Sequence, residues 1–85
     1  MNSSVENDQL KDELRSIVAS IGGISPDFDS KAHLYNDLGV PSVKALHLLL
    51  ALEERYGISI QDDEFVEATS LESLHSLMAR LVGHT

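Results

Sequence analysis

Apolar and polar residues follow the period of an α-helix along most of this chain. The first such segment covers residues 7–21, where apolar side chains recur at i, i+4, i+7, i+8 and i+11: Leu10, Leu14, Ile17, Val18 and Ile21. Gly22 and Gly23 follow, and glycine readily adopts the left-handed geometry with which helices commonly end. The pattern predicts a helix over residues 7–21, followed by a loop.

The loop is predicted to be long, extending from Ile24 to Val40. Ser25-Pro26-Asp27 is typical of a turn, and residues 31–34 are expected to form one helical turn, since loops of this length are usually functional or contain a short extra helix. Three of its apolar residues are expected to reach the core: Phe28, Leu34 and Leu38.

The second predicted helix begins near Pro41 or Ser42 and ends near Tyr56, before Gly57. One of its faces has the spacing of a core: Ala45, Leu48, Leu49, Leu52 and Tyr56. A second apolar stripe is turned partly away from this face: Val43, Leu46 and Leu50. A helix that is apolar around most of its circumference is either fully buried or presents a contact surface. Because a small domain cannot easily bury such a helix, we interpret the stripe as a contact surface, with plain core as the alternative.

The C-terminal half predicts two further helices. Ile58-Ser59-Ile60 alternates like a strand but is too short and has no partner, so we expect a loop that buries both isoleucines. Residues 61–68 predict a short acidic helix with Phe65 and Val66 turned inward. A last helix opens at Thr69 or Ser70, where residues 69–72 fit a capping box in which Glu72 supplies the carboxylate. Its apolar stripe ends at Gly83: Leu71, Leu74, Leu77, Met78, Leu81 and Val82. The predicted fold is all-α, a four-helix bundle with a long loop between the first and second helices and a short third helix.

Composition narrows the class of protein. Residues 1–85 suffice for one small domain, which we expect to be free-standing, and the absence of cysteine excludes disulfides, thiolate metal sites and a cysteine nucleophile. The net charge of −8 disfavours binding to nucleic acid and to anionic lipid. The N-terminus lacks the features of a signal peptide, and no apolar run approaches the roughly 20 residues that cross a bilayer. A cytoplasmic protein without membrane insertion is expected.

Clustered carboxylates raise the question of a metal site. Four acids lie close together in the third predicted helix: Asp62, Asp63, Glu64 and Glu67. They lack the spacing and the central glycine of a calcium-binding EF-hand loop, and acids are favoured in a first helical turn by the helix dipole. The four histidines do not form the i, i+4 pair of a metal-binding helix: His33, His47, His75 and His84. No metal site is predicted.

Several segments in a fixed order carry a resemblance to a known family. The chain contains Leu34-Tyr35-Asn36-Asp37-Leu38-Gly39, then Ser42, an apolar helix, and Leu52-Glu53-Glu54-Arg55-Tyr56-Gly57-Ile58-Ser59-Ile60. Thr69-Ser70-Leu71-Glu72-Ser73-Leu74 opens the final helix. Each motif alone is weak, but the ordered set over nearly the whole chain is fairly specific. The chain resembles acyl carrier proteins and the related peptidyl carrier domains.

The resemblance implies a cofactor and a set of partners. It places a covalent 4′-phosphopantetheine on Ser42, donated by coenzyme A through a phosphopantetheinyl transferase. Such a carrier holds acyl or aminoacyl groups as thioesters and meets an acyl- or aminoacyl-loading ligase and acyl-transfer or condensing enzymes. It is not itself an enzyme, and a monomer is expected. The partner surface is expected on the second helix: Val43, Lys44, Leu46, His47, Leu50, Glu53 and Glu54.

Two departures from the family pattern point to a specialised carrier. Pro41-Ser42-Val43 replaces the usual Asp-Ser-Leu, so the acid that normally precedes the serine is absent. Lys44 and His47 stand on the recognition helix where acids would be expected, which changes the choice of partner strongly. We therefore expect a specialised biosynthetic pathway rather than housekeeping fatty-acid synthesis.

The same residues also allow functions other than that of a carrier. Ser42 is also suited to a helix N-cap without modification. A cofactor-free interaction module would dock through Val43, Leu46 and Leu50. A serine hydrolase is the weakest option, because His47 at i+5 points away from Ser42, and His33 would need to approach as a base.

Overall fold

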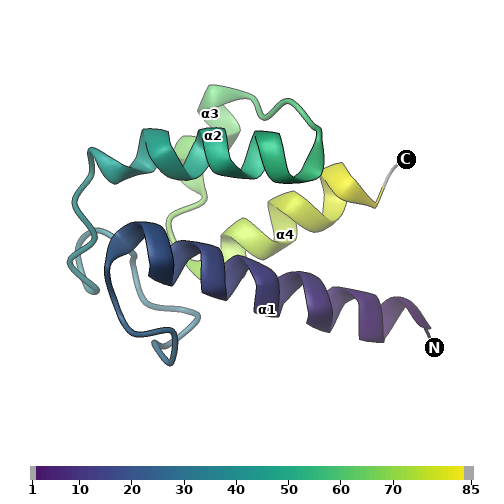
Figure 1. Cartoon of the computed structure of the whole chain (residues 1–85), viewed down its shortest axis with the longest axis horizontal. Coiled ribbons are helices and arrows are strands. Elements are labelled where there is room, and N and C mark those ends of the chain that lie inside the picture. Colours follow the sequence, from purple (N-terminus) through teal and green to yellow (C-terminus); the bar gives the residue numbers. More distant parts are fainter. Residues whose placement is uncertain (1, 84–85) are drawn as a thin grey trace.

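The computed structural model describes the backbone of residues 2–83 and the side chains of residues 9–83. Within this range the chain forms four helices: α1 (Asn2–Gly22), α2 (Lys44–Tyr56), α3 (Asp62–Glu67) and α4 (Leu71–Val82) (Figure 1). The described residues contain no strand. The prediction of an all-α fold with a long first loop and a short third helix is confirmed.

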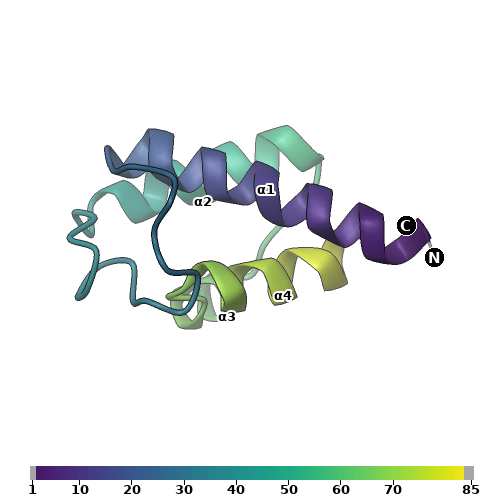
Figure 2. The ribbon, with the colours of Figure 1, turned by 90° about the horizontal axis from the view of Figure 1, so that it is seen from below.

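The three long helices run roughly along the long axis of the molecule. Helix α1 contacts both α2 and α4, while α3 contacts α4. The start of α1 and the end of α4 lie at one end of the molecule, and the long loop between α1 and α2 lies at the other (Figures 1 and 2). The beginning of α2, with Ser42 just before it, is therefore remote from both ends of the described chain.

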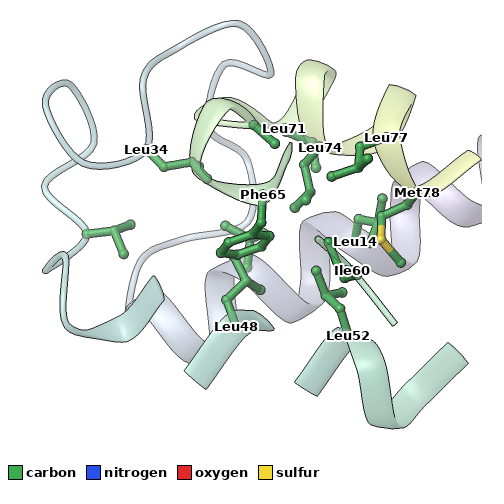
Figure 3. Packing of buried hydrophobic residues seen from close by; sticks show 13 residues of the cluster. Leu14, Leu34, Leu48, Leu52, Ile60, Phe65, Leu71, Leu74, Leu77 and Met78 are labelled. Carbon is green, nitrogen blue, oxygen red and sulfur yellow. The ribbon is translucent and has the colours of Figure 1, made fainter. Parts of the chain in front are cut away.

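The apolar faces of all four helices meet in one core (Figure 3). Leu14 and Val18 of α1, Leu48 and Leu52 of α2 and Phe65 of α3 are buried in it. From α4 and the connecting segments it receives Leu34, Val40, Ile60, Ala68, Leu71, Leu74, Leu77 and Met78. The faces predicted for α1, α2 and α4 are confirmed, since their remaining members pack partly buried against this cluster. Ile58 and Ile60 are likewise drawn to the core from a loop.

Helix α1 is longer than its apolar pattern indicates. It begins at Asn2 rather than near residue 7, because polar residues extend a helix beyond the segment that packs on a core. It ends at Gly22, and Gly23 adopts the left-handed conformation with φ of 70°. Met1, His84 and Thr85 lie outside the described residues.

The prediction of a helical turn over residues 31–34 is wrong. The loop instead forms hydrogen-bonded turns, with the Ala32 N–H donating to the Asp29 carbonyl at 3.1 Å and the Asp37 N–H to the His33 carbonyl at 2.9 Å. Phe28 and Leu38 are partly buried against the core, and Leu34 is fully buried, as predicted.

The capping box of α4 lies one residue later than predicted. Ser70 is the N-cap, and its hydroxyl accepts from the Ser73 N–H at 3.1 Å. The reciprocal bond comes from the Ser70 N–H to the Ser73 hydroxyl at 3.0 Å, so Ser73 replaces Glu72 in the capping box. The Glu72 N–H donates to the Ser30 carbonyl at 2.9 Å, which ties the long loop to the start of α4.

Candidate functional site

The segment before Ser42 is held by two buried apolar residues. Leu34 and Val40 both lie in the core, and the Val40 N–H donates to the Leu34 carbonyl at 3.0 Å. The Leu34 N–H donates in turn to the Thr69 carbonyl at 2.7 Å, which joins the loop to the segment between α3 and α4. Ser42 follows Val40 by two residues, so its position is set by this anchored segment.

His33 organises the turn between these anchors. Its Nδ1 accepts hydrogen bonds from the N–H groups of Tyr35 at 3.2 Å and Asn36 at 3.0 Å. The backbone N–H of His33 donates to the Asp37 Oδ2 at 2.9 Å. The imidazole therefore caps the turn in the way that serine or aspartate caps a helix. Sequence reasoning missed this role, because histidine is not a usual capping residue and only the acid four residues later hints at a turn.

Two glycines permit the approach of this segment to α1. A Cβ on Gly22 would lie 2.9 Å from Val40 Cγ2, so the end of α1 leaves room for the anchoring valine. Gly39 has φ of 75°, a conformation that other residues adopt only with strain. It turns the chain from the His33 turn toward Val40 and Ser42.

Ser42 lies just outside α2, which begins at Lys44 and not at Pro41 or Ser42 as predicted. The Lys44 N–H donates to the Pro41 carbonyl at 2.9 Å and the Ala45 N–H to the Ser42 carbonyl at 3.0 Å, so residues 41–43 form a turn that leads into the helix. Val43 holds the N-cap position, and no side chain caps α2. The prediction that Ser42 could serve as the N-cap of α2 is therefore wrong. Ser42 is exposed.

The surroundings of Ser42 favour a negatively charged group. The first turn of α2 contains no acidic residue and begins with Lys44. The N-terminus of a helix attracts anions through the positive end of its dipole. An exposed hydroxyl at this place is suited to a phosphodiester, which is the linkage through which phosphopantetheine is held on a serine.

The second apolar stripe of α2 faces solvent. The exposed fractions are 70% for Val43, 59% for Leu46 and 54% for Leu50. The prediction that these residues are not core is confirmed. His47 and Glu54 are exposed as well, and Lys44 is half-buried. Glu53 is engaged within the fold, because its Oε2 accepts from the Ile60 N–H at 2.9 Å.

The prediction that Val66 turns inward is wrong, since 70% of this residue is exposed. Consecutive residues of a helix point about 100° apart, and in the short α3 the core is reached by Phe65, with Ala68 just beyond the helix. Val66 therefore points away from the core. It is a fourth exposed apolar side chain, contributed by α3.

A pocket of about 230 Å³ lies beside Ser42. Its lining comes from the loop, α2, α3 and the segment after α3: Tyr35, Ser42, Ala45, Phe65, Val66 and Thr69. Burial raises the pKa of Tyr35 above its usual value and so further favours the neutral phenol. Sequence reasoning identified Ser42 but not this pocket, because its walls are far apart in the chain.

The carboxylates of α3 do not gather around a common point. Among residues 9–83 no group of three or more His, Asp or Glu side chains is placed to hold a metal ion. Glu64 instead pairs with Arg80 of α4 at 2.9 Å. Within the described part of the chain, no helix is both long enough and apolar enough to cross a membrane.

Comparisons with known proteins agree with this geometry. Residues 12–79 match the family described as "Phosphopantetheine attachment site". The chain is also similar to the polyketide-8 synthase acyl carrier protein 2 of Streptomyces avermitilis, with 30% identity over 76 residues, which cover 88% of this chain and 87% of that protein.

Proposed function

Because the chain belongs to the family of proteins with a phosphopantetheine attachment site, we propose that it carries acyl or aminoacyl groups on a 4′-phosphopantetheine arm attached to Ser42. Members of this family are carriers rather than enzymes, and the prosthetic group is bound covalently. The observation that best supports Ser42 is its exposed position before α2, with no part in capping the helix.

The attachment reaction requires few groups from the carrier itself. The Ser42 oxygen forms a bond to the phosphorus that bears the pantetheine, the nucleotide portion of coenzyme A leaves, and the serine proton passes to a base of the transferase. The carrier supplies an accessible hydroxyl, a helix N-terminus that favours the phosphodiester, and a fixed loop. His33 is not available as a base through Nδ1, because that atom accepts two backbone hydrogen bonds. These features support a modified serine over a catalytic one.

A tethered cargo explains why a small domain without an active site is useful. Attachment raises the effective concentration of the cargo at each partner to about the mM range. The family implies contact with a phosphopantetheinyl transferase and with biosynthetic enzymes. We propose that these biosynthetic enzymes include a loading ligase and acyl-transfer or condensing enzymes.

The exposed side of α2 is the proposed docking surface for these partners. It combines Val43, Leu46 and Leu50 with Lys44 and His47, and Glu54 lies further along the helix. An apolar stripe without a partner in the fold is typical of an interaction site. The basic residue on this acidic protein favours a partner with a carboxylate opposite Lys44. Glu53 also lies on α2, but its carboxylate already accepts a hydrogen bond from the Ile60 N–H within the fold.

The pathway is proposed to be a specialised one of polyketide type. Support comes from the similarity to the Streptomyces avermitilis protein and from the replacement of acids by Lys44 and His47. Residues 1–85 are proposed to act as a single carrier domain, because the described residues share one core. The carrier is further proposed to be a monomer.

The experiment that tests the attachment site is the intact mass of the protein after incubation with coenzyme A, Mg²⁺ and a broad-specificity transferase. The wild type is expected to gain the mass of one phosphopantetheine, and Ser42→Ala is expected to gain none. Ser76→Ala serves as the control, since it removes an exposed serine of α4 and leaves the site untouched. Circular dichroism establishes that each variant is folded.

Other outcomes lead to different conclusions. Modification of Ser42→Ala would refute the site. An unmodified wild type, tested with several transferases, would favour the cofactor-free interaction module that docks through Val43, Leu46 and Leu50.

A further inference from the structure

The pocket beside Ser42 is bounded on several sides by fixed elements. Ser42 contributes from the turn before α2, Ala45 from the first turn of α2, Phe65 and Val66 from α3, and Tyr35 and Thr69 from the two connecting segments. The hydrogen bond of 2.7 Å from the Leu34 N–H to the Thr69 carbonyl holds the last two segments together. Phe65 is itself buried in the core. The pocket is therefore preformed and not dependent on a rearrangement of the helices.

The residues that line the pocket are of two kinds. Ala45, Phe65 and Val66 have apolar side chains, while Tyr35, Thr69 and Ser42 itself bear hydroxyls. Val66 contributes little to the core, because 70% of this residue is exposed. The packing of the core therefore does not account for an apolar side chain at this position. A ligand that suits this lining has a small, branched apolar group flanked by polar atoms.

The location of the pocket restricts which part of a tethered group can reach it. Ser42 is one of the lining residues, so a group attached to its oxygen begins at the edge of the pocket. The first apolar part of a phosphopantetheine arm is the carbon that bears two methyl groups, close to the phosphate and followed by a hydroxyl and an amide. The thiol and its cargo lie much further along the arm.

We infer that the pocket holds this dimethyl segment, the pantoyl part of the arm, against Phe65 and Val66, with Tyr35 and Thr69 facing its polar atoms. The inference rests on the proposed attachment to Ser42. It assigns to Val66 a positioning role: the base of the arm is fixed on the carrier, while the thiol end remains free to reach partner enzymes. Fixing one end in this way reduces the conformational freedom that is lost when a partner binds the cargo.

The test compares the apo form with the holo form that bears a free thiol, each as the full chain labelled with ¹⁵N and ¹³C. Complete conversion is first established by intact mass. Isotope-filtered nuclear Overhauser spectra of the holo form are expected to show contacts from the two geminal methyls of the arm to Phe65 and Val66. The backbone amides of Val66 and Thr69 are expected to shift between the two forms, and the thermal midpoint of the holo form is expected to be higher.

Val66→Ala and Val43→Ala form a matched pair. Both remove the same two methyl groups from valines that are 70% exposed, but only Val66 lines the pocket. Val66→Ala is expected to weaken the contacts with the geminal methyls and to abolish the rise in thermal midpoint. Val43→Ala is expected to leave both unchanged.

Three results would overturn the inference. Complete modification without contacts to Phe65 and Val66 would mean that the arm is free in solvent, while attachment to Ser42 would stand. Contacts that appear only when an acyl group is loaded would mean that the pocket serves the cargo. An unmodified mass of the wild type would remove the premise and refute the proposed function as well.

Discussion

Phe65→Ala is expected to destabilise this protein more than its place in a short helix suggests. Helix α3 covers only Asp62–Glu67, and Phe65 is its one buried residue. Isolated helices of this length are unstable in water, so α3 depends on its packing against the core. Figure 3 shows the Phe65 ring directed into the cluster that α2 and α4 also line. The ring therefore attaches α3 to the rest of the molecule.

The magnitude follows from the burial of the ring. Phe65 is 7% exposed, and truncation of a buried phenylalanine to alanine costs about 3 to 5 kcal/mol. A domain of 85 residues has a total stability of about 4 to 13 kcal/mol. Phe65→Ala is therefore expected to remove a large share of the free energy of unfolding and to leave a domain that unfolds at low urea concentration.

Urea denaturation followed by circular dichroism measures this loss, with Val66→Ala as the control. Val66 is the next residue of the same helix but is 70% exposed, and its truncation is expected to change the free energy of unfolding by no more than about 0.5 kcal/mol. The contrast isolates packing from helix propensity, because both variants introduce alanine into α3. A loss below about 1 kcal/mol in Phe65→Ala, or equal losses in both variants, would refute the assignment of Phe65 as the anchor.

Two further predictions concern polar contacts. The pKa of Tyr56 is raised to about 12 by burial first and by its hydrogen bond to Glu13 second, so its neutral form stabilises the fold. This contribution is complete below the pKa of about 10 of the unfolded chain and is lost between pH 10 and 12. After allowance for solvent screening it amounts to about 1 kcal/mol, and Tyr56→Phe is expected to flatten the pH dependence of the urea midpoint in this window; an unchanged slope would contradict it. His33→Ala removes the acceptor for the Tyr35 and Asn36 N–H groups and is expected to cost about 1 kcal/mol, while His33→Ser restores part of the cap. Equal urea midpoints for His33→Ala and the wild type would show that the cap does not contribute.

The helices were predictable because each carries its own periodic apolar face. Leu14 and Val18 of α1, and Leu48 and Leu52 of α2, occupy positions that face the core in any amphipathic helix of this register. The exposure of Leu46 and Leu50 was also predictable, since a small bundle cannot cover both sides of one helix. Helix ends were less predictable, because polar residues give no periodic signal and α1 extends to Asn2 without one.

The details of the site were less accessible from the sequence. Helix α2 starts at Lys44 and not at Ser42, because the turn at residues 41–43 is placed by the buried Val40 and by the room that Gly22 leaves for it. The capping role of His33 and the replacement of Glu72 by Ser73 in the cap of α4 depend on geometry among groups that composition does not distinguish.

By itself the sequence determined the number and order of the helices and the inward faces of the three long ones, and its resemblance to carrier proteins pointed to Ser42 as the proposed residue for a phosphopantetheine. Only the tertiary structure decided that Val66 faces solvent and that Tyr35, Ala45 and Thr69 meet beside Ser42 in one pocket. The physical reason is the separation along the chain of the residues that interact. Helical periodicity acts between residues three or four positions apart, whereas the pocket is built by the packing of a loop, two helices and a connecting segment that are distant in the chain.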